Sequence, residues 1–129
     1  MLISLDMTGD DPIYLQLRNE IVLGIASRRL QGGEGLPSVR QLAEDLGINA
    51  MTVNKAYTLL KEQGFIEIDR RQGAKVRVST EAAPHFPGRW QQQLALLIAE
   101  GLARGMEKGE LMKTCEQLFE ILNQGEKTQ

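Results

Sequence analysis

The segment 36–57 constrains the fold more than any other part of this 129-residue chain. It contains a helix-start signal at Ser38, a glycine, Gly47, that permits a left-handed turn, and a second helix-start signal at Asn49. Apolar residues at helical spacing follow each start signal. Two helices joined by so short a turn are typical of a helix-turn-helix, so the segment predicts one over about residues 39–58. The second helix of such a pair can lie in the major groove of DNA.

A capping box is expected at the start of the first of these helices. Ser38 and Gln41 stand at the spacing at which each side chain bonds the backbone N–H of the other. The helix would therefore begin at Val39 and end at Gly47, with Leu42 facing the core.

The second helix has one apolar and one polar face. Val53, Ala56, Tyr57 and Leu60 have the spacing of a buried face, which favours Tyr57 as a core residue over Tyr57 as a DNA contact. The side chains that remain available to DNA point away from that face or lie at its edge: Met51, Asn54, Lys55 and Thr58.

A basic β-hairpin is expected after this helix, which would end at Gly64. Apolar and charged residues alternate along 66–69 and again along 75–78, which predicts a hairpin over about 65–78. Its tip, 70–73, carries two arginines and a glycine. Such a tip suits a wing laid against a phosphate backbone, although charges there could also protect a strand edge. The basic residues of the helix pair and the hairpin are Arg40, Lys55, Arg70, Arg71, Lys75 and Arg77.

An amphipathic helix is expected before the pair, from about Pro12 to Arg29. A proline at the first turn suits a helix start, and Ile13, Leu17 and later isoleucines recur every fourth residue as one apolar stripe. The glycine-rich stretch 31–35 would then form a loop.

The C-terminal part is expected to form a separate helical domain. Prolines and a glycine mark a linker at 80–88, between a DNA-binding domain at 1–79 and a helical domain at 89–129. Two apolar stripes predict two helices in the second domain, with a corner near 105–109.

A two-helix hairpin of this size buries little surface on its own, so its apolar faces are expected to meet a second copy of the chain. Gly101 and Gly105, one turn apart, would permit close approach of helices. Trp90 could stack on a ligand, but packing in the helix interface is the favoured interpretation. The candidate dimerisation residues are Trp90, Leu94, Leu97, Ile98, Gly101, Leu102, Leu111, Cys115, Leu118, Phe119 and Leu122.

Composition argues against several other classes of protein. One cysteine, Cys115, and one histidine, His85, are too few for a disulfide or a zinc site, and no catalytic set emerges, so we expect no metal, no cofactor and no enzymatic activity. No apolar run approaches the roughly 20 residues of a membrane span, which predicts a cytoplasmic protein that does not enter membranes. The net charge of −2 disfavours nucleic acid by itself, but the acidic excess lies after residue 80.

Four blocks of the sequence, at 12–16, 36–43, 52–57 and 62–66, resemble the winged-helix domain of GntR-type bacterial transcription regulators. The short helical tail resembles the YtrA-like subgroup, whose members are dimeric and often encoded beside transporter genes. The resemblance implies a mostly α fold with a small β-hairpin wing, in which an N-terminal winged helix-turn-helix precedes a C-terminal two-helix dimerisation hairpin.

The resemblance also implies DNA contacts by Arg40 and Thr52 and a wing tip at Gly73. Two positions that are often arginine in the family are Ala50 and Asn54 here, so the family's guanine contacts do not carry over. Asn54 could instead pair with an adenine edge, and Ala50 or Met51 could touch a thymine methyl. The candidate DNA-binding residues are Arg40, Asn49, Met51, Thr52, Asn54, Lys55, Thr58, Arg70, Arg71, Gln72 and Gly73.

The favoured function is therefore a sequence-specific transcription regulator, more often a repressor by the resemblance, that binds a palindromic operator as a homodimer. The alternative is a winged helix used only for protein contact, which would need an apolar or acidic face on the second helix of the pair. A pyridoxal-phosphate enzyme domain, found in some relatives, needs a much longer chain. A small-molecule effector is left open, and its pocket would lie between two chains around Trp90 and Met106.

Overall fold

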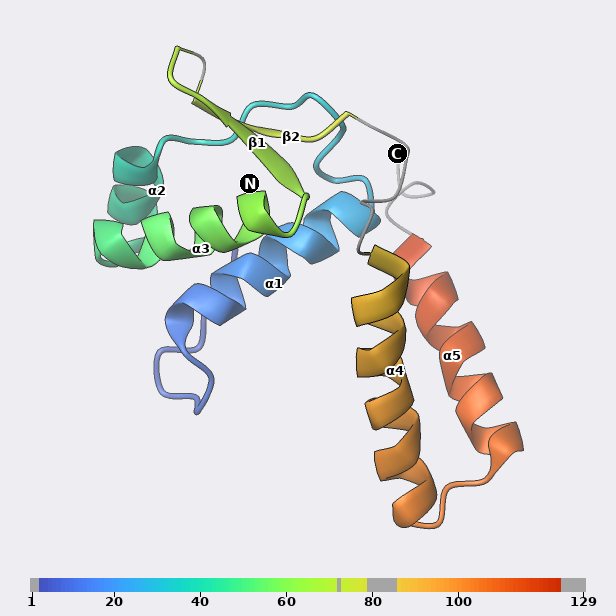
Figure 1. Ribbon diagram of the computed structural model, residues 1–129. Coiled ribbons are helices and arrows are strands. Elements are labelled where there is room, and N and C mark those ends of the chain that lie inside the picture. Colours follow the sequence, from blue (N-terminus) through green and yellow to red (C-terminus); the bar gives the residue numbers. More distant parts are fainter. Residues whose placement is uncertain (1–2, 72, 79–85, 124–129) are drawn as a thin grey trace.

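The computed structural model describes residues 3–71, 73–78 and 86–123, and in these ranges it contains five helices and one two-stranded sheet (Figure 1). The expected fold class is confirmed, because a small winged helix precedes a two-helix hairpin. In chain order the elements are α1 (Ile13–Ala26), α2 (Val39–Leu46), α3 (Ala50–Glu62), β1 (Ile66–Asp69), β2 (Gly73–Val76), α4 (Phe86–Ala103) and α5 (Lys108–Asn123).

Helix α1 is shorter than its sequence pattern suggests. It ends at Ala26 rather than near Arg29, because Arg28 adopts a left-handed conformation with φ of 63° that an α-helix cannot contain. Leu17 is fully buried on its inner face. Near the end of α1, position 24 requires a glycine. A Cβ there would lie 2.9 Å from the Leu30 side chain, which folds back over the helix.

The α2–α3 turn follows the expected capping pattern with one difference. The Ser38 hydroxyl accepts a hydrogen bond from the backbone N–H of Gln41 (3.1 Å), and Gly47 supplies the left-handed residue with φ of 68°. The capping box is nevertheless incomplete, because the Gln41 side chain donates to Asp45 (2.8 Å) instead of reaching back to Ser38. Asn49 then caps α3 by accepting from the N–H of Met51 (2.7 Å).

The core lies where α3 packs on both α1 and α2. Val53, Ala56, Tyr57 and Leu60 are each at most 2% exposed, which confirms the predicted buried face. Tyr57 also has a polar role that its spacing did not indicate, because its hydroxyl donates a 2.8 Å hydrogen bond to the carbonyl oxygen of Pro37. This bond fixes the backbone directly before α2, and so the direction in which the first turn of α2 is presented.

Tyr57 should make the protein sensitive to alkali. Burial raises the pKa of Tyr57 to about 12, whereas an unfolded tyrosine ionises near pH 10. Between these values the folded chain holds the phenolic proton and the unfolded chain releases it, so stability is lost as the pH rises. We expect the free energy of unfolding to fall by about 1.4 kcal/mol per pH unit across this window because of this one group. Urea titrations from pH 9 to 12 should show this component in the wild type and lack it in Tyr57→Phe, and equal pH slopes would contradict the assignment.

The wing is anchored to the body of the domain by the loop that precedes α2. Strands β1 and β2 pair antiparallel, with Ile66 opposite Val76. The segment 33–36 runs along the free edge of β2, where the N–H of Gly33 donates to Val76 (2.8 Å) and the N–H of Leu36 donates to Ala74 (2.8 Å). Strand β2 is therefore hydrogen-bonded on both of its edges, and the tip of the hairpin projects from the molecule (Figure 1).

Helices α4 and α5 form a hairpin beside the end of α1, which α5 contacts (Figure 1). Helix α4 begins at Phe86, so 86–88 is helical rather than part of a linker, while the rest of the expected linker and His85 lie outside the described residues. The corner is also tighter than 105–109, because α5 begins at Lys108. None of the helices in the described ranges is both long and apolar enough to cross a membrane.

Candidate nucleic-acid interface

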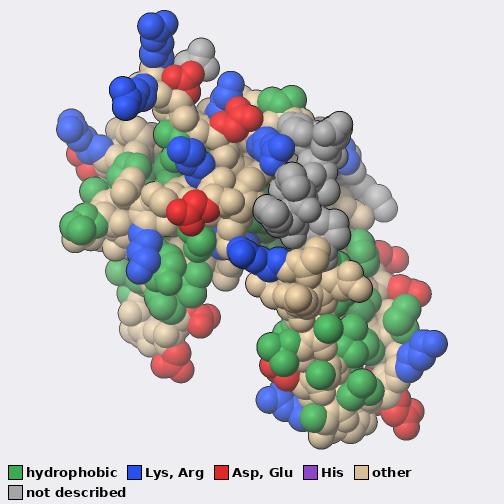
Figure 2. All heavy atoms as spheres, in the orientation of Figure 1, with side chains coloured by type: hydrophobic (Ala, Val, Ile, Leu, Met, Phe, Trp, Pro, Cys, Tyr) green, Lys and Arg blue, Asp and Glu red, His purple; other side chains and the backbone are tan. Residues whose placement is uncertain are grey.

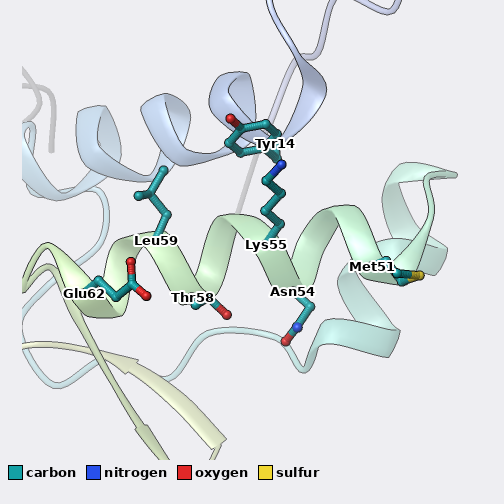
Figure 3. A pocket seen from close by; sticks show the side chains of 7 residues that line it. All are labelled: Tyr14, Met51, Asn54, Lys55, Thr58, Leu59 and Glu62. Carbon is teal, nitrogen blue, oxygen red and sulfur yellow. The ribbon is translucent and has the colours of Figure 1, made fainter.

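One face of α3 is open to solvent and carries no arginine. Met51 is 79% exposed, and Asn54, Lys55 and Thr58 are exposed beside it. In Figure 3 Asn54 and Thr58 point away from α1, whereas Lys55 points toward it. This face borders a shallow groove of about 500 Å³ between α1 and α3, which is lined by Tyr14, Met51, Asn54, Lys55, Thr58, Leu59 and Glu62.

The start of α3 has less freedom to contact DNA than its sequence suggests. Asn49 is exposed, but its side-chain oxygen already accepts the helix-cap hydrogen bond, which fixes the orientation in which its amide group can meet an outside partner. Thr52 is half-buried. Arg40, in the first turn of α2, is exposed, and the Tyr57 bond to Pro37 holds the turn that carries it.

The wing tip is a basic turn whose backbone is fixed by one carboxylate. Asp69 accepts a 2.8 Å hydrogen bond from the N–H of Arg71, and Gly73 has the positive φ of 77° that returns the chain into β2. Arg70 and Arg71 are both exposed. Gln72, the fourth residue of the expected tip, lies outside the described residues.

Two residues of the expected basic group turn out to be differently engaged. Arg77 is half-buried, with its guanidinium 3.5 Å from the carbonyl oxygen of Gly64, and Lys75 stands opposite Glu67 in the hairpin. The exposed cations that can meet phosphate are therefore the other members of the group: Arg40, Lys55, Arg70 and Arg71. Figure 2 shows basic side chains projecting from this part of the surface.

Sequence reasoning missed Tyr14 as a residue of this surface. The Lys55 ammonium lies over the Tyr14 ring, with Nζ 4.1 Å from the ring centroid. Periodicity alone places Tyr14 beside the apolar stripe of α1, where a packing role is the natural interpretation. Its only other sequence signal is its place in the block 12–16 that carries the family resemblance.

The hairpin presents the second candidate surface, which is apolar (Figure 2). Helix α5 has no buried residue, and Phe119 on it is 70% exposed. Of the expected dimerisation residues, those that are large and exposed are Trp90, Leu97, Leu102, Leu118, Phe119 and Leu122, whereas Leu94, Ile98, Gly101, Leu111 and Cys115 are half-buried. Met112, which the sequence places in the apolar stripe of the last helix, is exposed as well, and two further exposed apolar residues were missed: Leu96 and Ile121.

The two glycines of the hairpin are placed differently from the sequence interpretation. Gly101 packs against its own corner, since a Cβ there would lie 3.3 Å from the sulfur of Met106, and Gly105 lies in that corner with φ of 90°. The two glycines therefore do not form a helix-docking stripe. Trp90 lies near the start of α4 and Met106 in the corner beyond its end, roughly 20 Å apart at 1.5 Å per residue, so a pocket that holds both stays the expected one, between two chains.

Among the described residues, no group of three or more His, Cys, Asp and Glu side chains is placed to hold a metal ion. Likewise, the described core contains no buried polar or charged residue. The surface features that the structure offers are thus a polar helix face, a basic wing and an apolar hairpin.

Comparison with known proteins identifies the family of the winged helix. The sequence profile for "Bacterial regulatory proteins, gntR family" matches residues 11–76. The chain is 28% identical to the HTH-type transcriptional repressor YtrA of Bacillus subtilis over 128 residues, which cover 98% of both proteins.

Solved structures extend the likeness into the helical hairpin. YtrA from Sulfolobus acidocaldarius, a GntR-family transcription factor, aligns with a TM-score of 0.67 and 35% identity over 80% of this chain and 99% of that one. A protein described as a transcriptional antiterminator from Listeria monocytogenes EGD-e aligns with a TM-score of 0.86 over 95% of this chain and 92% of that one. Its identity is 24%, so it supports the fold alone.

Proposed function

Because this chain belongs to the GntR family of DNA-binding transcription regulators, we propose that it is a repressor that binds a palindromic operator as a homodimer. Its relatives are transcription regulators, which are not enzymes. Repression is supported by the similarity to B. subtilis YtrA, a named repressor that matches over nearly the whole of both chains.

The observation that carries the DNA-binding mode is the placement of the exposed cations around an uncharged helix face. Met51, Asn54 and Thr58 are uncharged and exposed on α3, which suits contact with base edges in a major groove. Arg40 on α2 and the two arginines of the wing tip lie outside that face. We propose that these cations bind backbone phosphates and fix the orientation of α3.

Dimerisation is supported by the apolar surface of α4 and α5. A hairpin whose second helix has no fully buried residue leaves most of its hydrophobic side chains in water, and a second copy would cover them. A twofold dimer would place two α3 helices on one face of the duplex. The operator half-sites would then be centred about 10 base pairs, or a multiple of this, apart.

The salt dependence of binding tests the phosphate contacts. Genomic fragments captured by the wild-type protein serve as specific duplexes, and scrambled duplexes serve as non-specific ones. Replacing Arg70 or Arg71 by alanine should weaken binding to both kinds of duplex. The slope of log K against log salt should fall by about 0.9 for each phosphate that the variant no longer neutralises, or roughly 2 for both chains of a dimer.

Lys113→Ala on α5 removes an equal charge from an exposed site far from the wing, and it should leave the slope unchanged. If both wing variants keep the wild-type slope, the wing does not bind phosphate. If the wild type captures no fragment at all, a protein-contact module becomes the better interpretation of the winged helix.

The YtrA-like resemblance further leads us to propose transporter genes as targets. Sequencing of the captured fragments tests this directly, because they should lie upstream of genes whose products contain several membrane spans.

A further inference from the structure

Lys55 has a fixed neighbour on α1. Its ammonium lies 4.1 Å from the centroid of the Tyr14 ring, within the distance at which the negative face of an aromatic ring attracts a cation (Figure 3). Tyr14 is half-buried at the start of α1, so the ring has a packed position, whereas Lys55 is exposed and its long side chain could otherwise point in several directions. The Tyr14 ring therefore holds the Lys55 side chain in one direction, toward α1.

That direction leads away from the base-reading face. Successive residues of an α-helix are turned by about 100° around its axis, so Lys55 and its neighbour Asn54 leave α3 on different sides. Asn54 and Thr58 point away from α1, and Lys55 points to it. The ammonium is consequently placed at the flank of α3.

We propose that Tyr14 is a positioning residue that directs Lys55 to the phosphate backbone and keeps it from reading bases. This inference rests on the proposed function, in which α3 enters the major groove. A lysine ammonium has three N–H donors, so it can face the ring on one side and still donate to a phosphate oxygen on another. Without the ring, the flexible side chain can reach the O6 and N7 atoms of guanine, which lysine and arginine favour.

The consequence is a recognition helix that prefers A·T pairs. The Asn54 amide matches the donor and acceptor of an adenine edge, and the highly exposed Met51 side chain can contact a thymine methyl. Neither side chain favours guanine. Of the residues that the structure describes, Lys55 is the one cation that lines the groove between α1 and α3. The Tyr14 ring thus keeps this cation from reading bases.

The test is selection of binding sites from a pool of randomised duplexes by the full-length protein and its variants. Wild type and Tyr14→Phe, which keeps the ring, should select the same A·T-rich half-site. Tyr14→Leu should accept guanine at one position of each half-site, with about a tenfold loss of discrimination. Lys55→Met should keep the wild-type preference, and its salt slope should fall by roughly 2 for a dimer.

The double variant separates positioning from a general structural effect. In the Lys55→Met background, Tyr14→Leu should leave the base preference unchanged, because no ammonium remains to be released. A relaxed preference in that background, or a Tyr14→Leu protein that selects the wild-type half-site, would overturn the inference while leaving the proposed function intact. A wild-type protein that selects no common sequence would overturn the proposed function, and this inference with it.

A measurement on the wild type keeps the test independent of whether the variants fold. Ring currents should shift the ε-methylene protons of Lys55 upfield in the NMR spectrum of the free protein, and the shift should persist when a selected duplex is bound. Loss of the shift on binding would mean that Lys55 leaves Tyr14 in the complex, which contradicts the inference.

Discussion

Replacing Phe119 by glutamate should convert the protein to a monomer and weaken operator binding by about two to four orders of magnitude. Phe119 is 70% exposed within one chain, so its removal leaves the fold of that chain nearly untouched. In the proposed dimer the new carboxylate would be buried among apolar side chains without a partner, which is strongly unfavourable. A monomer binds a single half-site and loses the high effective concentration of its second winged helix, and this loss accounts for the expected factor.

Sedimentation and operator titrations at one salt concentration measure the two effects together. Gln117→Glu adds the same charge to an exposed polar position of α5, so it should leave both the dimer and the affinity unchanged. Leu97→Glu on α4, where the leucine is also exposed, should reproduce the effect of the Phe119 variant. If both apolar variants stay dimeric, the dimer interface lies elsewhere on the molecule.

The elements that the sequence predicts well are those governed by local rules. Caps at Ser38 and Asn49 and the glycine between α2 and α3 act within a few residues, and the structure contains all three features. The buried face of α3 follows from helical spacing alone. Local chemistry therefore determined the bounds of the helix-turn-helix closely.

Spacing rules do not predict features in which a residue has two possible hydrogen-bond partners or two possible backbone conformations. Gln41 has both the Ser38 backbone and the Asp45 carboxylate within reach, and a spacing rule does not decide between them. The left-handed conformation of Arg28 stops α1 although its sequence continues to favour a helix. Both differences arise where two local arrangements compete for the same residues.

The Tyr14 contact with Lys55 is of another kind, because it joins residues far apart in the chain. It requires the packing of α1 on α3 before the two side chains can meet. The exposed apolar residues missed on the hairpin, such as Leu96 and Ile121, have a related cause. A single stripe was assigned to each helix, whereas each helix carries apolar side chains on more than one side.

Asn54→Ala should weaken binding to the selected operator by about 1–3 kcal/mol for each half-site, and a twofold dimer incurs this loss twice. The reason is that the Asn54 side chain points into the open from the exposed face of α3 and can form two hydrogen bonds to one adenine edge, which alanine cannot replace. Binding to scrambled duplexes should change little, because that binding depends on the phosphate contacts. Competition titrations against both duplexes therefore measure the expected change, which is the ratio of operator affinity to affinity for scrambled duplexes.

Changing Asn54 to arginine should move the preference rather than abolish it. A guanidinium at this position can bond the O6 and N7 atoms of guanine, so the variant should favour operators in which a G·C pair replaces one A·T pair in each half-site. Asn123→Arg, at the exposed end of α5, is the matched control and should keep the base preference of the wild type. The position of the exchanged base pair would locate Asn54 on the operator. If Asn54→Arg selects the wild-type sequence, α3 does not read bases through this residue, and specificity must then come from the shape of the duplex.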